Sequence, residues 1–137
     1  LKDDFYSLNC PKSLDRQYFN KYFKKLKLID RKDSIHTATM ITILSIVNCI
    51  RLNRIKIKNI ILTGGGRKNL FLYNSLKKKL LKEKIQLTII DQYGLDGDMI
   101  ESQMFAYLAV RSYKNLPLSS PTTTGVKKQI SGGVLYQ

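Results

Sequence analysis

The sequence of 137 residues predicts an α/β fold, and two observations carry this prediction. Two short apolar runs, residues 58–63 and 85–90, have the composition and length of buried strands. Between them, residues 69–83 carry leucines at helical spacing, with lysines on the other side. Because a helix between two strands usually crosses over a sheet, we expect the strands to pair in parallel.

Two helices are predicted before the first strand. Residues 16–28 carry aromatic and apolar residues every three or four positions, and Asp15 is a suitable N-cap. A longer helix follows, apolar on more than one side and ending near Leu52. Its N-cap is expected at Asp33 or Ser34.

The chain after the second strand predicts one more helix and a short strand. Residues 97–113 place apolar side chains on one helix face, and this helix is expected to begin near Asp96 or Asp98. Two prolines interrupt the chain beyond it, and residues 127–137 favour a last short strand. No repeat, low-complexity tract or linker divides the sequence, so we interpret residues 1–137 as a single unit.

The chain is strongly basic, with 24 lysines and arginines, 10 acidic residues and a net charge of +14. Nucleic acid would suit this charge, but no recognition module accompanies it, and lysines on solvated helix faces explain it better. The single histidine, His36, and the distant Cys10 and Cys49 form no metal or disulfide motif, so we expect no metal site and a reducing cytoplasm. The most apolar run, residues 38–50, is shorter than the ~20 residues of a membrane span, so we expect no membrane partner.

Three successive glycines, Gly64 to Gly66, directly follow the first strand. Glycine admits positive φ angles and the close approach of a ligand, and the helix behind the turn offers free N–H groups that suit a phosphate. The segment matches neither G-x-G-x-x-G nor G-x-x-x-x-G-K-[ST], so a purely structural turn stays open as well. Asn69 either caps the helix or reaches a ribose or base.

Two carboxylates lie at the start of the last predicted helix. Glu101 shares a helix face with three apolar residues that we expect to face the core, Met104, Phe105 and Leu108. Asp98 and Glu101 have the spacing of a capping box with Asp98 as N-cap, which would explain both residues. Asp96 competes for the cap, so a ligand contact by Asp98 or Glu101 is the alternative.

Three blocks of the sequence, in order, resemble the anhydro-N-acetylmuramic acid kinase family. GLDGDMIESQMFAYLAVRSYKNLPLSSPTTTG, residues 94–125, resembles the family's G-x-x-G-D-x-x-E-A-x-x-F-A-x-L-A-x-R pattern and the G-L-P-x-x-x-P-x-x-T-G segment after it. CPKSLDRQYFN resembles P-P-K-S-T-G-R-E-x-F-N, and TGGGRKN resembles C-G-G-G-x-x-N. The sequence departs from these patterns at Cys10, Leu14, Asp15 and Ser102.

This resemblance implies one lobe of a two-lobed, actin-like sugar kinase related to ribonuclease H, with helices packed on a small mixed sheet. It implies ATP, with Mg²⁺, as the donor and 1,6-anhydro-N-acetylmuramic acid as the acceptor. Water opens the anhydro ring, and N-acetylmuramic acid 6-phosphate enters cell-wall recycling in the cytoplasm. The implied nucleotide contacts are Gly64, Gly65, Gly66 and Asn69. The implied substrate contacts are Glu101, Asp98, Lys12, Ser13 and Arg16.

The resemblance also implies a missing part. The family's first phosphate loop, and the aspartate proposed as general base, belong to an N-terminal lobe that no residue here matches. We therefore expect this chain to be the C-terminal lobe, a fragment without catalytic residues that is inactive alone. The alternatives are an inactive nucleotide-binding or dimerisation module, so that a homodimer stays open, and thirdly a basic nucleic-acid-binding domain.

Overall fold

The computed structural model describes residues 3–9, 12, 15–52, 56–134 and 136, with the side chain of Arg16 left out. The helices and strands follow the predicted order as far as the helix after the second strand, beyond which the described residues add one short helix. They are α1 (Asn20–Leu26), α2 (Arg31–Leu52), β1 (Asn59–Leu62), α3 (Leu70–Lys82), β2 (Gln86–Ile89), α4 (Ile100–Tyr113) and α5 (Pro121–Thr124). Short 3₁₀ helices join them, namely η1 (Asp4–Ser7), η2 (Arg16–Phe19), η3 (Gly65–Lys68) and η4 (Ile90–Tyr93).

β1 and β2 form a two-stranded parallel sheet, which confirms the predicted pairing. Leu62, the last residue of β1, lies opposite Ile89, the last residue of β2. Because the strands are parallel, their carboxyl ends meet at one edge, where β1 leads into η3 and β2 into η4. The mixed sheet implied by the resemblance is not formed by the described residues, which add only an antiparallel bridge between Ser119 and Ile130.

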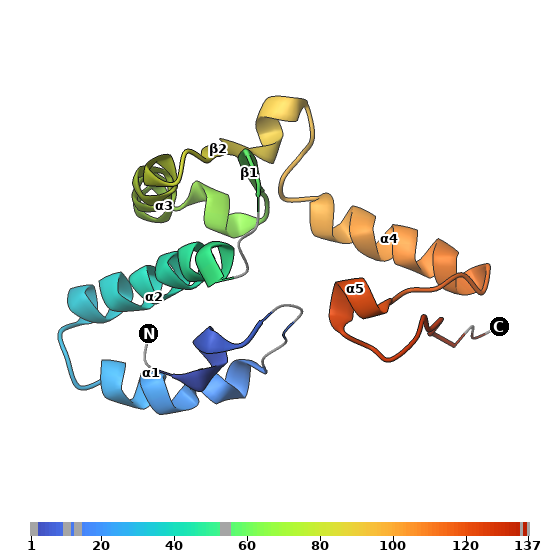
Figure 1. Ribbon diagram of the computed structural model, residues 1–137, viewed down its shortest axis with the longest axis horizontal. Coiled ribbons are helices and arrows are strands. Elements are labelled where there is room, and N and C mark those ends of the chain that lie inside the picture. Colours follow the sequence, from blue (N-terminus) through green and yellow to red (C-terminus); the bar gives the residue numbers. More distant parts are fainter. Residues whose placement is uncertain (1–2, 10–11, 13–14, 53–55, 135, 137) are drawn as a thin grey trace.

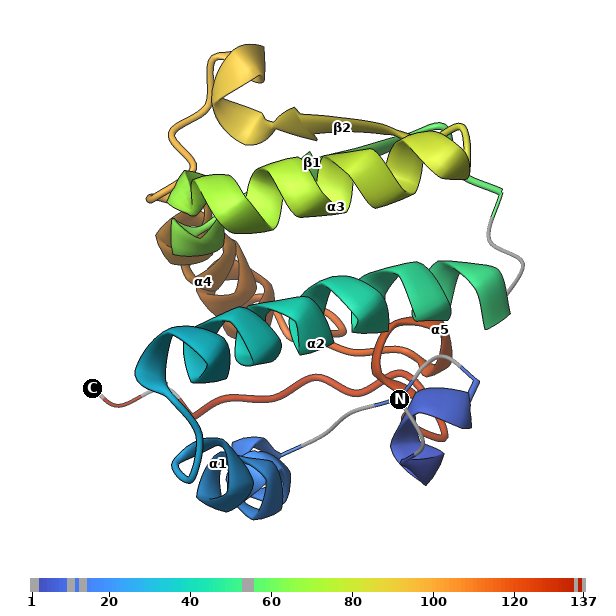
Figure 2. The ribbon, with the colours of Figure 1, turned by 90° about the vertical axis from the view of Figure 1, so that its left-hand side faces the viewer.

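The helices stack in layers on the sheet (Figures 1 and 2). α3 packs on β2, α2 packs on α3, and α1 and η1 contact α2 on the side away from α3. The core lies between α2, α3 and the sheet, with three fully buried side chains at its centre, Ile43, Leu76 and Leu80. α2 is thus covered on two sides, as its broad apolar surface predicts.

α2 begins earlier than the sequence predicts. The Asp30 carboxylate accepts a hydrogen bond from the Lys32 amide at 2.8 Å. Asp30, and not Asp33 or Ser34, therefore caps the N-terminus of α2. With 22 residues, α2 is long and apolar enough to cross a membrane by length and composition alone. The helix extends well beyond the predicted apolar run of residues 38–50, so length does not decide the matter, and core helices of soluble proteins share these properties.

α4 extends away from these layers (Figure 1). It begins at Ile100 without a side-chain cap, so the predicted capping box of Asp98 and Glu101 is wrong. The reason is that the Asp98 carboxylate is paired with two cations near the glycine turn. The apolar face predicted to point into the core is also uncovered, because Met104 is 47% and Phe105 60% exposed.

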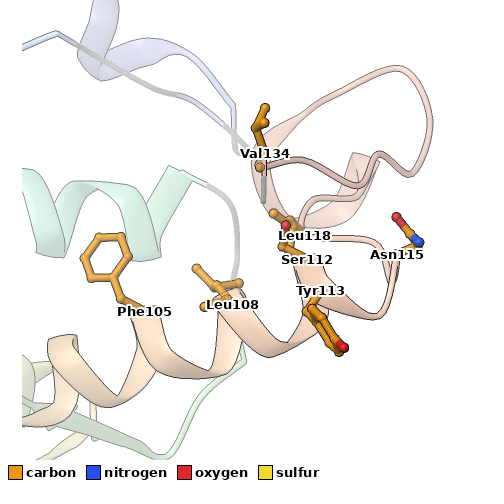
Figure 3. A pocket seen from close by; sticks show the side chains of 9 residues that line it. Phe105, Leu108, Ser112, Tyr113, Asn115, Leu118 and Val134 are labelled. Carbon is orange, nitrogen blue, oxygen red and sulfur yellow. The ribbon is translucent and has the colours of Figure 1, made fainter. Parts of the chain in front are cut away.

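The C-terminal residues fold back along the second half of α4. Arg111 donates from Nε to the Pro117 carbonyl at 2.8 Å, and the Ser112 hydroxyl donates to the Gly132 carbonyl. The strand predicted within residues 127–137 is absent from the described part, which makes a single bridge instead. A mainly apolar pocket between α4 and this segment holds none of the predicted site residues, and its lining includes Phe105, Leu108, Leu118 and Val134 (Figure 3).

Candidate functional site

The glycine turn lies at the carboxyl edge of the sheet, directly behind β1. Gly64 has a φ of 71° and a ψ of −179°, a backbone conformation that is nearly restricted to glycine. Gly65 and Gly66 have no positive φ, and a Cβ at either position would meet no atom within 4 Å. Of the three glycines in this turn, the fold therefore requires only Gly64.

The turn continues into η3, and not directly into the long helix that the sequence predicts behind it. Asn69 follows η3, and its side-chain oxygen accepts a hydrogen bond from the Leu72 amide at 3.0 Å. The prediction that Asn69 caps α3 is thereby confirmed, while its contact with a nucleotide stays a prediction. The amides of Gly65 and Gly66 donate to no other backbone group in the described chain, so they are open to an anion.

A buried arginine holds the turn in place. The Arg67 side chain is 6% exposed, and its Nε and Nη2 bind the two oxygens of Asp91 at 2.7 and 3.0 Å. Its Nη1 donates to the Gly64 carbonyl at 3.0 Å and to Asp98 Oδ1 at 2.7 Å. Lys68 Nζ lies 2.5 Å from the other Asp98 oxygen. Paired, bidentate contacts of this kind fix direction as well as distance.

The cations change the acidity of both carboxyl groups. Arg67 first, and then Lys68, holds the pKa of Asp98 well below its usual range, and Arg67 also lowers the pKa of Asp91. Asp98 and Asp91 in turn raise the pKa of Arg67. Both carboxylates are therefore charged at neutral pH and poorly suited to accept a proton as a general base. The described residues also contain no cluster of three His, Cys, Asp or Glu that could hold a metal ion.

Glu101 differs from Asp98 in its surroundings. It lies in the first turn of α4, is exposed, and forms no ion pair with another described residue. The Arg67–Asp98 pair lies just before this turn and connects it to the glycine turn. Sugar contacts by Glu101 and Asp98 stay predictions, and Glu101 has the more available carboxylate.

The other predicted substrate residues lie elsewhere. Lys12 donates from Nζ to the Phe5 carbonyl at 2.9 Å and lies over the Phe5 ring. Ser13 and the side chain of Arg16 lie outside the described residues. η2 packs with α1, on the side of α2 that faces away from α3, so the described helices of this block lie apart from the glycine turn (Figure 2). A sugar contact by these three residues stays a prediction.

The sequence motifs did not predict a role for Arg67, Lys68 or Asp91. A usable signal was present, because Arg67 closes the glycine run behind one strand and Asp91 follows the end of the other strand by two residues. Parallel strands end at the same edge, so opposite charges just beyond both ends are expected to meet.

Comparison with known proteins agrees with the three sequence blocks. The family model described as anhydro-N-acetylmuramic acid kinase matches residues 1–137. A protein of that name from Pelagibacter ubique is 43% identical over 139 residues, and the match covers 98% of this chain. Relatives of the same name from Roseobacter denitrificans and a Ruegeria species are 37% and 33% identical, over 90% and 98% of this chain.

The chain spans only about a third of these relatives, namely 37%, 32% and 35% of their lengths in the same order. The family match runs through residues 1–137 and therefore includes the glycine turn, the loop of residues 94–99 that contains Asp98 (the Asp98 loop) and the start of α4. This full-length match and the identity with the relatives show that the chain belongs to the anhydro-N-acetylmuramic acid kinase family.

Proposed function

We propose that this chain forms the nucleotide-binding lobe of a two-lobed, actin-like kinase for 1,6-anhydro-N-acetylmuramic acid. ATP with Mg²⁺ donates the phosphoryl group, water opens the anhydro ring, and the product is N-acetylmuramic acid 6-phosphate for cell-wall recycling in the cytoplasm. One observation carries the proposal. Within the turn, the fold needs glycine only at position 64, yet glycine also occupies the exposed positions 65 and 66, where no described residue crowds the backbone.

The place of this turn supports a nucleotide as the ligand. Ligands of open α/β folds bind beyond the carboxyl ends of parallel strands, and the turn lies at that edge. The amides of Gly65 and Gly66 suit phosphate oxygens, and the missing side chains let a phosphate approach them. Asn69 uses its side-chain oxygen for the α3 cap, which leaves its amide NH₂ to donate to a ribose or base.

The magnesium ion fits this proposal without a metal-ligand cluster among the described residues. Mg²⁺ at phosphoryl-transfer sites keeps several waters and is held by substrate phosphates with one or two carboxylates. The described residues offer no dedicated three-ligand cluster. We therefore assign the Mg²⁺ ligands to the phosphates of ATP and to the portion of the kinase that this chain does not span.

Glu101 is the residue we assign to the sugar. Its exposed carboxylate has no ion-pair partner in the described chain, whereas Asp98 is held by Arg67 and Lys68. A carboxylate can accept hydrogen bonds from sugar hydroxyls. Because the Asp98 loop joins α4 to the glycine turn, a sugar at Glu101 would lie on the same side of the sheet edge as the nucleotide.

A second lobe is part of the proposal. The chain spans 37% of the Pelagibacter ubique kinase, and the apolar face of α4 is uncovered, with Met104 47% and Phe105 60% exposed. This face suits contact with the remainder of the kinase, which would supply the general base and the first phosphate loop. Closure of two lobes around the substrates excludes water from phosphoryl transfer, so we expect the isolated chain to be inactive.

A graft tests the kinase. In the Pelagibacter ubique protein, the matching third is replaced by this chain, and the product is followed with ATP and 1,6-anhydro-N-acetylmuramic acid. We expect turnover by the graft and by the parent, and none by the 137-residue chain alone. A graft that unfolds cooperatively like the parent but makes no sugar phosphate contradicts the proposed activity. Turnover by the chain alone at about 1–100 s⁻¹, the usual kinase range, contradicts the two-lobe requirement.

A binding module without turnover is the second candidate, because the whole glycine turn and its arginine lie within this chain. Calorimetry of the isolated chain with ATP distinguishes this candidate. Heat of binding at millimolar ATP supports nucleotide binding by the isolated chain. If no heat is released, the binding module is excluded, and nucleotide binding requires the complete kinase.

A further inference from the structure

Arg67 occupies the junction of three chain segments. Gly64 opens the turn behind β1, Asp91 follows β2, and Asp98 precedes α4, and all three accept hydrogen bonds from this one guanidinium. Four of the five guanidinium N–H groups are used in these bonds, since Nε and Nη2 donate once and Nη1 twice. At most one donor is left for a ligand, so Arg67 is poorly placed to bind phosphate itself.

The segments also close around the guanidinium through the backbone. The Gly64 amide donates to the Gly97 carbonyl at 3.0 Å, which ties the glycine turn directly to the loop before α4. Gly97 is buried, and a Cβ there would contact Arg67 Nε and would lie 2.7 Å from Arg67 Cζ and 2.8 Å from a methyl group of Ile90. Glycine at position 97 therefore provides the space that Arg67 fills.

We propose that Arg67 is a positioning residue that holds the nucleotide turn and the start of α4, with Glu101, as one unit. This inference rests on the proposed function for the identity of the two ligands, but not for the linkage itself. Through its bond to Gly64, the guanidinium fixes the direction of the Gly65 and Gly66 amides. Through its bond to Asp98, it fixes the position of the first turn of α4, and with it that of Glu101. The phosphate-binding backbone and the sugar-binding carboxylate are then in register before either substrate arrives.

Lysine cannot take over this role. Its ammonium group is a point charge that cannot bind Asp91 in a bidentate manner while it also reaches Gly64 and Asp98. Arg67→Lys therefore keeps the positive charge and removes the linkage. Lys68→Ala is a matched control, because Lys68 is 63% exposed and contacts Asp98 without touching the turn or Asp91.

Amide hydrogen exchange on the 137-residue chain tests the linkage without any ligand. We expect Arg67→Lys to speed exchange of the Gly64 and Gln103 amides at least about tenfold, because these amides report the turn and the first turn of α4. Lys68→Ala should leave both amides unchanged. Val47→Ala weakens the core without touching Arg67, and corrects for any loss of global stability. Equal exchange at Gly64 in the Arg67→Lys and Val47→Ala proteins would overturn the inference.

Steady-state kinetics of the graft test its consequence. Arg67→Lys should raise the KM for ATP and the KM for the sugar together, each by about fivefold or more. Gly65→Ala should raise the KM for ATP alone, since its methyl group touches nothing that leads to Glu101. An unchanged KM for the sugar in the Arg67→Lys graft would overturn the positioning role. An unsubstituted graft that is folded but inactive counts against the proposed function only, because hydrogen exchange decides the linkage without turnover.

Discussion

Alanine in place of Gly65 separates a ligand-binding turn from a purely structural one. A Cβ at this position meets no atom within 4 Å, and the backbone φ is not positive. Alanine should therefore fit the free chain without strain. It also restricts the unfolded chain, so we expect the free energy of unfolding to rise by about 0.4–1 kcal/mol.

The same methyl group should harm nucleotide binding. It would stand between the Gly65 or Gly66 amide and a phosphate oxygen, and a hydrogen bond to a charged group contributes about 1.5–3 kcal/mol. Loss of one such bond lowers the affinity for ATP about 10- to 150-fold. Stability and affinity are thus expected to change in opposite directions.

Gly64→Ala is the matched control for this experiment. Its φ of 71° is strained for alanine, so we expect a loss of about 1–3 kcal/mol of stability. Urea unfolding followed by circular dichroism measures the stability of the free chain, and the KM for ATP of the graft measures binding. A Gly65→Ala protein that keeps its ATP affinity would refute the ligand-binding role, and one that loses as much stability as Gly64→Ala would refute the structural reasoning.

Three further changes test the fold by urea unfolding. Leu76→Ala should lower the free energy of unfolding by about 2–5 kcal/mol, because Leu76 is fully buried. Leu70→Ala, at a residue 74% exposed, should change it by less than about 0.5 kcal/mol. Similar losses in the two proteins would contradict the assigned core. Asn69→Ala should cost about 1 kcal/mol, and Asn69→Ser should restore most of it, because serine also caps helices; no effect of either would exclude the cap. Asp98→Asn should be less stable than the unsubstituted chain at pH 7, because Arg67 and Lys68 lower the pKa of Asp98 in the folded state. This difference in stability should shrink as the pH falls below about 4, where Asp98 takes up a proton first in the unfolded chain and, in stronger acid, in the folded chain. A difference that grows in acid would contradict the pairing.

The strand–helix–strand unit could be predicted closely from sequence because its signals are local. β1, α3 and β2 each begin and end within one residue of the predicted runs. Asp15 and Asn69 cap the elements that follow them, as their residue types predict, because a capping side chain reaches only two or three residues along the chain. The parallel pairing followed from the crossover helix alone.

The start of α4 could not be predicted this way because distant contacts decide it. Asp98 is paired with Arg67, which lies 31 residues earlier, so its carboxylate is not available to cap the helix. The spacing of Asp98 and Glu101 predicted that these two residues act together. It did not predict Arg67, the cation that lies beyond the ends of both strands. Periodicity likewise found the apolar face of α4, which includes Met104 and Phe105, but could not tell whether its partner lies within this chain.

The parallel pairing of β1 and β2 has a consequence for the order of folding. A hairpin can close through a short turn, but these strands cannot meet until residues 63–85 have turned back across the sheet. α3 lies in that segment and shares the core with both strands, so its formation reduces the entropy cost of bringing them together. Changes at the N-cap of α3 are therefore expected to slow the association of the strands, and not only to lower the stability of the folded chain.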